Sequence, residues 1–211
     1  MKKVITTFVA LALIVSVTSC KETTEKKSKK SKKERLEDRA EDDATTYSIG
    51  DIVNSGVVFW LDSTGQHGLV VAFSDVAKKV EWGCADTDLP NVTNVAFQLL
   101  RDNKPVGLGA EIGDGFNNTN NILKDCSTAP AALAARSLGA QWFLPSINEL
   151  KKIYDNKTTL EGVSGFTRFS YYYWSSTEGD NVGAWRQDSD FGNQDYDVKN
   201  YPGNVRAVRA F

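Results

Sequence analysis

The chain has 211 residues, of which 41% are hydrophobic and 10% aromatic, and its formal net charge is −2. This length accommodates one domain with a real core plus appendages. From Thr46 onward there are 14 basic and 19 acidic residues, so the globular part is mildly acidic and lacks the basic surface expected of a nucleic-acid binder.

The first 19 residues have the pattern of a secretion signal. Lys2 and Lys3 form a positive end, and Val4–Val17 is an apolar run that is too short and wrongly flanked for a membrane span. The segment ends at Val17-Thr18-Ser19-Cys20, which resembles a bacterial lipobox, where the signal is cut before an acylated Cys. An ordinary cleavage site with a chance Cys is the alternative. We expect Cys20 to anchor an exported lipoprotein in the bacterial cell envelope, in the outer membrane.

Residues 20–46 are expected to form a charged, disordered tether that begins with the lipidated Cys. The stretch Lys21–Thr46 has one large apolar residue, Leu36, and cannot bury a core. Its basic block, Lys26–Lys33, could lie on anionic lipid head groups, but a solvated spacer is the simpler interpretation. The folded domain is predicted to cover residues 47–211.

Apolar runs of strand length open this domain. Gly56–Asp62 and Gly68–Asp75 are separated by the turn-like segment Ser63–His67, and this arrangement predicts a β-hairpin. Lys79–Trp82 is a candidate third strand, and Val92–Arg101 is a candidate short helix.

Three segments in the middle of the chain are predicted to be helices, and two are predicted to be loops. The helices are Asn117–Cys126, Ala129–Leu138 and Ile147–Asn156, and the loops are Lys104–Asn118 and Thr158–Arg168. The first helix offers Asn and Thr side chains as caps, and Gly139 suits the end of the second. Ser146 with Glu149 three residues later forms a capping box at the start of the third.

The last part of the chain contains three strand-like runs. Ser170–Ser176, Val182–Gln187 and Val205–Phe211 are rich in aromatic and β-branched residues, and Gly, Asp and Asn lie between them. A chain end without a polar tail is expected to be tied down as a strand in a sheet. The order of hairpin, helices and strands predicts an α+β domain.

Several short motifs follow one another from Gly50 to the end of the chain. They are Gly50-Asp51, Gly56–Asp62, Gly65–Leu69, Trp82–Cys84, Trp142–Leu150, Tyr173–Glu178, Ala184-Trp185 and Val205–Phe211. In this order the chain resembles the Lcl C-terminal domain family, formerly a domain of unknown function. The resemblance implies a C-type lectin-like fold, with a mixed, mostly antiparallel sheet, two to three helices and long loops that carry the ligand. It also implies that the N-terminal strand Gly56–Asp62 pairs with the C-terminal run Val205–Phe211.

The resemblance further implies a binding module at the cell surface. Some members of the family are adhesin ends that bind sulfated glycans, but this domain is acidic and has no Lys/Arg cluster outside the tether. The Glu-Pro-Asn, Gln-Pro-Asp and Trp-Asn-Asp motifs of Ca²⁺-dependent sugar-binding C-type lectins are absent from the sequence. Trp174-Ser175-Ser176 stands near such a position, and Ser is a poorer Ca²⁺ ligand than Asp.

If Cys20 is acylated, Cys84 and Cys126 are the two cysteines left in the sequence. Two cysteines in an exported domain are usually paired, so we expect a disulfide between them. The alternatives are free buried thiols or a metal-binding pair of the kind that formylglycine-generating enzymes, which share the C-type lectin-like fold, place in their site.

The acidic stretch Asp188–Asp197 is the centre of the predicted ligand-binding site. Its four Asp and Asn193 could supply oxygen ligands to Ca²⁺, although the spacing does not match an EF-hand and a solvated hairpin loop is the alternative. Trp185, Tyr196 and Tyr201 could stack on sugar rings or belong to the core. The predicted binding residues are Glu178, Asp180, Trp185, Arg186, Asp188, Asp190, Asn193 and Tyr196. The acidity favours a neutral or cationic ligand, with Ca²⁺ as a candidate bridge and no other cofactor.

Catalytic motifs do not occur in the sequence. His67 is the only His and lies in a predicted turn, and there is no Gly-x-Ser-x-Gly elbow, phosphate loop or His-Glu-x-x-His. Ser175 and Ser176 are interpreted as packed hydroxyls. The sequence therefore favours a lipid-anchored envelope module that binds a glycan or a surface protein without catalysis. A structural surface component and an enzyme on the formylglycine-generating-enzyme fold are the alternatives.

Overall fold

The computed structural model describes residues 45–96 and 104–211. Thr46–Phe211 forms a unit of its own, and the elements described below all belong to it. Cys20 and nearly all of the predicted tether, together with the end of the predicted helix Val92–Arg101, lie outside the described residues. Within the described part of the chain, no helix is long and apolar enough to cross a membrane.

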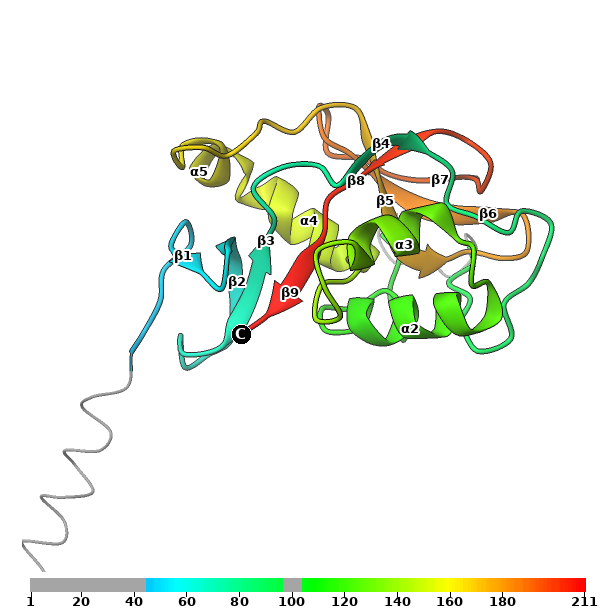
Figure 1. Ribbon diagram of the computed structural model, residues 1–211, viewed down its shortest axis with the longest axis horizontal. Coiled ribbons are helices and arrows are strands. Elements are labelled where there is room, and N and C mark those ends of the chain that lie inside the picture. Colours follow the sequence, from blue (N-terminus) through cyan, green and yellow to red (C-terminus); the bar gives the residue numbers. More distant parts are fainter. Residues whose placement is uncertain (1–44, 97–103) are drawn as a thin grey trace, which may run out of the picture. The chain divides into compact units, whose positions relative to one another are not determined.

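Two sheets form the framework of an α+β fold (Figure 1). The first has four strands in the order β1-β2-β3-β9: β1 (Ile52–Val53), β2 (Gly56–Leu61), β3 (Gly68–Val71) and β9 (Val208–Ala210). The second has five in the order β4-β8-β5-β6-β7: β4 (Ala77–Val80), β5 (Tyr172–Glu178), β6 (Gly183–Asp188), β7 (Gln194–Val198) and β8 (Gly203–Val205). Neighbouring strands are antiparallel except β5 and β8, which pair in parallel.

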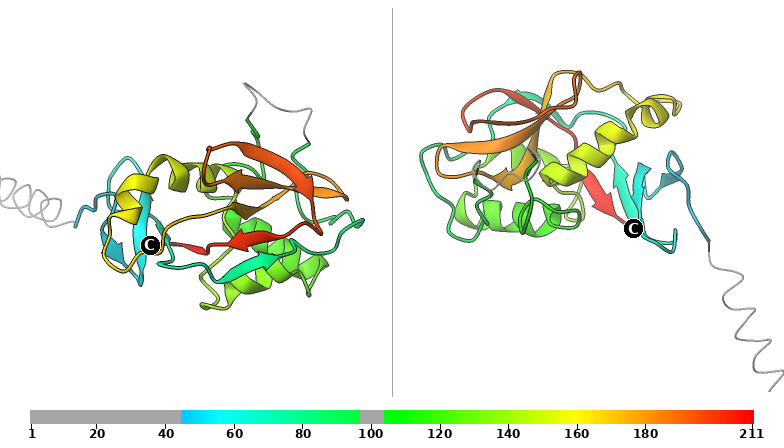
Figure 2. Two further views of the ribbon diagram at one scale, coloured as in Figure 1. Left: turned by 90° about the horizontal axis from the view of Figure 1, so that it is seen from above. Right: turned by 180° about the vertical axis from the view of Figure 1, so that it is seen from behind.

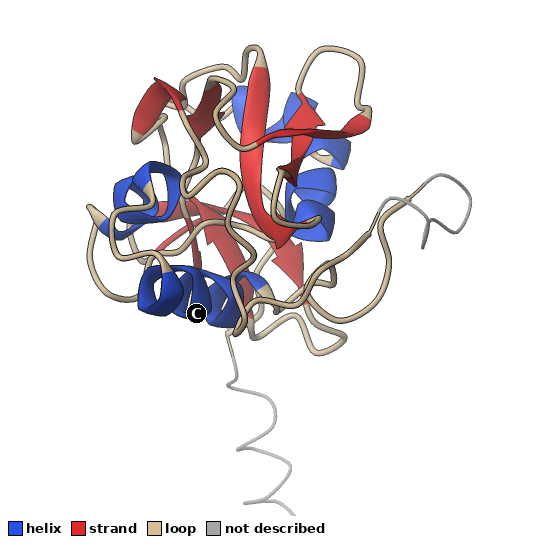
Figure 3. Ribbon diagram, turned by 90° about the vertical axis from the view of Figure 1, so that its right-hand side faces the viewer, coloured by secondary structure: helices blue, strands red, loops and turns tan. Residues whose placement is uncertain are grey.

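The helices cover both sheets. They are α2 (Gly115–Asp125), α3 (Pro130–Arg136), α4 (Ile147–Asp155) and α5 (Lys157–Glu161). The pair α2 and α3 lie side by side and pack against β5 and β4, whereas α4 packs against β2, β5 and β6 (Figures 2 and 3).

Strands β2 and β3 have apolar side chains on both faces because each face belongs to a different part of the core. Side chains alternate along a strand, so Val57 and Phe59 point into one buried cluster and Val58 into the other. This explains why Gly56–Leu61 has no polar alternation, and why its apolar run predicts a strand and not a surface segment.

Several predicted elements are confirmed. The hairpin corresponds to β2 and β3, and the three predicted helices correspond to α2, α3 and α4. The capping box is present at the start of α4: the Ser146 hydroxyl accepts from the Glu149 backbone N–H at 3.2 Å, and the Glu149 carboxylate accepts from the Ser146 N–H at 2.7 Å.

The predicted pairing of Gly56–Asp62 with Val205–Phe211 is wrong. One edge of β2 pairs with β3 and the other with β1, so the last strand β9 joins the free edge of β3. The run Val205–Phe211 is also two strands, β8 and β9, in different sheets. The break falls at Arg206, whose side chain turns into the interior and bonds to Asp75.

Other differences are local. Lys157–Glu161 forms the short helix α5 where a loop is predicted, and Val92–Ala96 is not helical. Helix α2 begins at Gly115, and its N-cap Asp114 makes no side-chain cap bond, so the predicted Asn and Thr caps are wrong.

Candidate functional site

The predicted binding residues lie on or beside strands β5, β6 and β7, but the fold does not bring them to one surface. Glu178 and Trp185 are buried, so their prediction as ligand contacts is wrong. The Trp185 indole N–H donates to the Val95 carbonyl at 2.6 Å, which fixes the ring in the interior. The alternation of β6 places Trp185 and Arg186 on opposite faces.

Glu178 pairs with a residue that the sequence did not single out. The ammonium group of Lys199 lies 2.5 Å from the Glu178 carboxylate, and both side chains are fully buried. Burial raises the pKa of Glu178 to about 7, against the opposing effect of its hydrogen bond from Lys199. Lys199 also donates to the Thr87 carbonyl and lies over the Trp82 ring, so this ion pair holds the loop after β4 to the second sheet.

Three further predicted residues hold turns in place. The Tyr196 hydroxyl donates to Asp180 at 2.5 Å, and the Tyr196 ring packs against Gly183, where a side chain would not fit. Asp188 is buried and accepts from the backbone N–H groups of Asp190 and Phe191. These contacts serve the two hairpins that join β5 to β6 and β6 to β7.

Asp190 and Asn193 are exposed in the second hairpin loop. The loop therefore has the form of the solvated hairpin that was the alternative interpretation. Among the described residues, no group of three or more His, Cys, Asp or Glu side chains is arranged to hold a metal ion.

Arg186 is largely buried, and its guanidinium contacts tyrosine rings that reach the surface. Its guanidinium carbon is 3.8 Å from the ring centroid of Tyr172 and 5.4 Å from that of Tyr201, and the guanidinium is ion-paired with Asp197. The Tyr172 ring meets the Tyr171 ring edge-on at 5.2 Å. Tyr172 and Tyr201, which contact Arg186, together with Tyr171, which contacts Tyr172, form what we call the tyrosine ridge.

A hollow of about 310 Å³ adjoins the ridge, where β4, β8 and the chain entering β5 come together. It is lined by Lys78, Lys79, Ser170, Tyr171, Pro202 and Asn204. Tyr171 belongs to both hollow and ridge, and Pro202 follows Tyr201 directly. Tyr171 and Tyr201 are 38% and 47% exposed, so both features present aromatic surface to solvent.

The backbone around the hollow is strained and held in place. Lys79 and Tyr171 have φ values of 53° and 68°, a left-handed conformation that costs a residue other than Gly about 1–2 kcal/mol. Asn204 braces both segments: its carbonyl oxygen accepts from the Lys79 N–H, and its amide donates to the Ser170 carbonyl. Ser189 donates to the Tyr171 carbonyl through its N–H and its hydroxyl. Strained residues that the surrounding structure fixes in this way are typical of binding sites.

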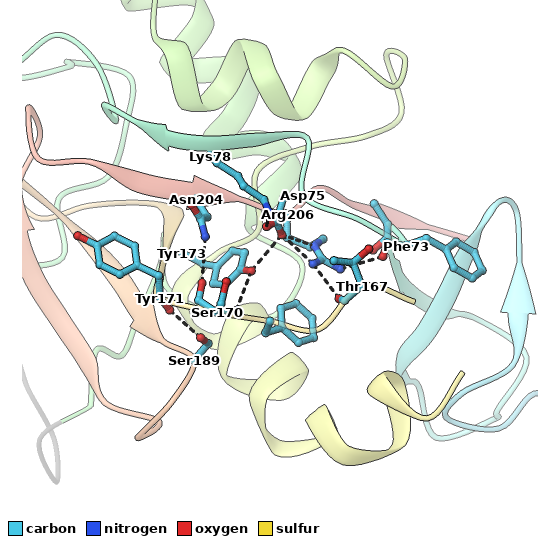
Figure 4. A network of polar contacts seen from close by, with 12 residues as sticks. Phe73, Asp75, Lys78, Thr167, Ser170, Tyr171, Tyr173, Ser189, Asn204 and Arg206 are labelled. Atoms are coloured by element: carbon cyan, nitrogen blue, oxygen red, sulfur yellow. Dashed lines mark hydrogen bonds and ion pairs between the residues drawn. The ribbon is translucent and has the colours of Figure 1, made fainter. Parts of the chain in front are cut away.

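A buried polar network supports the floor of the hollow (Figure 4). The Tyr173 hydroxyl accepts from the Ser170 N–H at 3.2 Å and donates to Asp75 at 3.0 Å. Arg206 donates to the same Asp75 oxygen at 2.7 Å and also to the Thr167 carbonyl. Burial, followed by the charge of Asp75, raises the pKa of Tyr173, so this hydroxyl stays protonated. The network ties the residues before β5 to β8 and the segment after β3.

The cysteines, serines and histidine that the sequence analysis considered have structural positions in the fold. Cys84 and Cys126 form the expected disulfide, with their Cα atoms 6.3 Å apart. Ser175 and Ser176 are buried and hydrogen-bonded, which confirms them as packed hydroxyls. His67 is exposed in the turn between β2 and β3.

The residues of the hollow lie in segments whose pattern predicts only strands. Lys79 begins the predicted strand Lys79–Trp82, and the triple Tyr171-Tyr172-Tyr173 lies in the strand-like run Ser170–Ser176. In the fold, the three tyrosines serve the hollow, the ridge and the buried network in turn.

No protein-family model matches the chain, and no curated protein matches it. Among solved structures, the chain is similar to the crystal structure of a fimbrial protein from Bacteroides ovatus, with 17% sequence identity and a TM-score of 0.48. The match covers 78% of this chain and 46% of that chain, so this chain spans about half the length of the fimbrial protein.

Proposed function

We propose that this protein is a lipid-anchored binding module of the bacterial cell envelope, and that it recognises a saccharide through the hollow and the tyrosine ridge. The observation that carries the proposal is the hollow of about 310 Å³ whose lining includes Lys78, Lys79 and Asn204. Exposed tyrosines border it, and its backbone is strained at Lys79 and Tyr171 and held in place by hydrogen bonds. A volume of this size suits one or two sugar rings, because small-molecule sites range from about 300 to 1,000 Å³.

The chemistry of the surface favours a saccharide. Sugar rings have apolar C–H faces and polar edges, and aromatic side chains with a polar handle match this combination. Tyr171 and Tyr201 supply exposed rings, while Ser170, Lys78 and Lys79 supply hydrogen-bond donors around the same hollow.

The location at the envelope rests on the sequence. The positive end, the apolar run and the lipobox at Cys20 support export and lipidation. Replacing Cys20 by Ala should move the protein from the membrane fraction to the soluble fraction with loss of the acyl mass. Unchanged partitioning would contradict the anchor.

The family and the finer fold are part of the same proposal. The ordered motifs from Gly50 to Phe211 support membership of the Lcl C-terminal domain family and a C-type lectin-like architecture. An α+β framework with largely antiparallel sheets agrees with that proposal at the level of fold class.

A glycan array tests the binding role. The full-length Cys20→Ala protein should bind a defined subset of saccharides, and Tyr171→Asn with Tyr201→Ala should weaken binding about tenfold or more, because two ring contacts are lost. Asn is chosen at Tyr171 because it tolerates the left-handed backbone. The matched control is Phe191→Ala, which removes an aromatic ring that is 80% exposed on a nearby hairpin. Equal losses in both variants, or none in the ridge variant, would contradict the assignment of the ridge.

A structural or protein-binding role is the second candidate, and Phe191 favours it. This ring is exposed at the tip of a hairpin that Asp188 braces through two backbone hydrogen bonds. A rigid exposed aromatic residue can anchor a protein partner. Loss of partner binding in Phe191→Ala, with an empty glycan array, would favour this role.

A further inference from the structure

We infer that the hollow binds a carboxylate group carried by the saccharide, and that the ammonium groups of Lys78 and Lys79 recognise it. The inference rests on the proposed function and narrows the ligand to an acidic sugar of low charge density. It reverses the expectation, drawn from the acidity of the whole domain, of a neutral or cationic ligand.

The charged side chains that line the hollow are cationic. Lys78 and Lys79 line the hollow, and no acidic residue does. The side chain of Asp75, which pairs with Lys78, is only 1% exposed, and the buried guanidinium of Arg206 balances its charge. Lys78 lies 3.9 Å from the second oxygen of Asp75, but its side chain is 65% exposed and therefore accessible to a ligand. The hollow is thus a cationic spot on an otherwise acidic domain.

The polar side chains that line the hollow and can reach a ligand are hydrogen-bond donors. The amide of Asn204 is used on both sides, by Lys79 and by Ser170. Ser170 and Tyr171 are exposed residues, and their hydroxyl-bearing side chains line the hollow. The accessible side-chain groups are therefore two exposed ammonium groups, which only donate, and two hydroxyls, which can donate. A set of donors around one hollow is suited to a carboxylate, which only accepts.

The surroundings of the hollow favour a ligand with one carboxylate over a densely charged polyanion. Beyond the ridge, β6 and β7 carry Asp188, Asp195 and Asp197 close together. Burial, then repulsion from Asp188 and Asp197, raises the pKa of Asp195 against the opposing effect of Arg186. Asp188 is buried and Asp197 is paired with Arg186, so the partly exposed Asp195 is the carboxylate that a chain with many sulfate groups would meet beside the ridge. A saccharide with one carboxylate in the hollow and neutral rings over the ridge avoids the repulsion.

The test is an NMR titration of the full-length Cys20→Ala protein with sodium glucuronate, sodium galacturonate and N-acetylneuraminate at millimolar concentration. Glucose and galactose serve as the neutral counterparts. We expect the three acids to shift the backbone amide signals of Lys79, Ser170 and Tyr171, and to bind about tenfold or more tightly than the neutral sugars, as expected for charge-assisted hydrogen bonds. The binding should weaken as the salt concentration rises.

The charge-removing variant is Lys78→Gln/Lys79→Asn, in which Asn preserves the left-handed backbone. It should lose about tenfold or more of its affinity for the acids and none for neutral sugars. Lys151→Gln/Lys152→Gln on α4 removes the same charge elsewhere and should bind like the parent protein. Unchanged far-ultraviolet circular dichroism and urea midpoint will show that each variant is folded.

The outcomes separate the two proposals. If neutral sugars bind as tightly as the acids and only Tyr171→Asn with Tyr201→Ala weakens them, the carboxylate inference is overturned and the saccharide function stands. If a sulfated oligosaccharide binds more tightly than the three acids through the same lysines, the choice of a carboxylate is overturned. If none of the acids shifts the signals around the hollow, the inference fails, and an empty glycan array as well would remove the proposed function.

Discussion

The replacement of Ser146 by Ala tests how the start of α4 is held. Ser146 is completely buried, and its hydroxyl makes two hydrogen bonds: it accepts from the Glu149 N–H at 3.2 Å and donates to the Glu111 carbonyl at 2.8 Å. Loss of an N-cap costs about 1 kcal/mol. Loss of the hydrogen bond to the Glu111 carbonyl, which is partly buried, adds about 1 kcal/mol. The variant should therefore be less stable by about 2 kcal/mol, the sum of these two contributions.

The measurement is urea unfolding of the wild-type protein and the variants, with calorimetry as a second assay. For a domain of this size the expected loss lowers the melting temperature by roughly 4–8 °C. Ser146→Gly should lose the Glu111 bond but little of the cap, and so cost about half as much. Ser164→Ala, at an exposed serine, is the matched control and should change the stability by less than about 0.5 kcal/mol. A Gly variant less stable than the Ala variant would refute this account of the cap.

Three other predictions concern the buried chemistry. Replacing Cys84 and Cys126 by Ser should cost about 4 kcal/mol, because the disulfide links residues separated by 42 positions; two alkylated thiols in protein from the envelope would contradict the bond. Burial raises the pKa of Glu149 from 4.5 to about 7, so the folded state holds its proton more tightly and the free energy of unfolding should fall as the pH rises from 4.5 to 7; urea unfolding of Glu149→Gln should show a smaller fall, and not its complete loss, because the pKa of Glu178 is also raised to about 7. Lys199→Met should cost about 3–5 kcal/mol because it leaves Glu178 buried and unpaired, and Lys199→Met with Glu178→Gln should recover part of the loss; a single variant as stable as wild type would show that the pair is dispensable.

The local elements of this fold could be predicted because their signals are short-range. Ser146 and Glu149 are three residues apart, and the hydrogen bonds of their capping box depend on that spacing alone. The β2–β3 hairpin follows from two apolar runs and one turn. The disulfide between Cys84 and Cys126 followed from the cysteine count and the export signal.

The arrangement of strands and of the site could not be predicted in the same way. β9 pairs with β3 because β1 occupies the other edge of the β2–β3 hairpin. This pairing joins residues that are far apart in the sequence, so local patterns do not predict it. The buried partners Glu178 and Lys199, which are 21 positions apart, look like surface charges in the sequence. Composition alone therefore placed Glu178 in the binding site, although burial next to a cation removes it from the surface.

The hollow could not be predicted from the sequence, because it also depends on long-range contacts. It depends on Lys79 and Tyr171 adopting left-handed backbones, and neither residue type favours that conformation. Asn204, more than 100 positions from Lys79, holds the arrangement. The acidic composition of Asp188–Asp197 therefore indicates a site in that hairpin loop, whereas nothing in the local sequence indicates the cationic hollow.

Photoaffinity labelling tests the central claim, that the hollow and the ridge form the binding face, most directly. A saccharide identified on the array would be given a photoreactive group, cross-linked to the full-length protein, and the labelled peptides identified by mass spectrometry. The account predicts labels in the peptides that contain Lys78-Lys79, Ser170–Tyr172 or Tyr201–Asn204, and their loss in Tyr171→Asn with Tyr201→Ala. Labels confined to the Asp190–Asn193 loop or to α4, and unchanged in that variant, would contradict it.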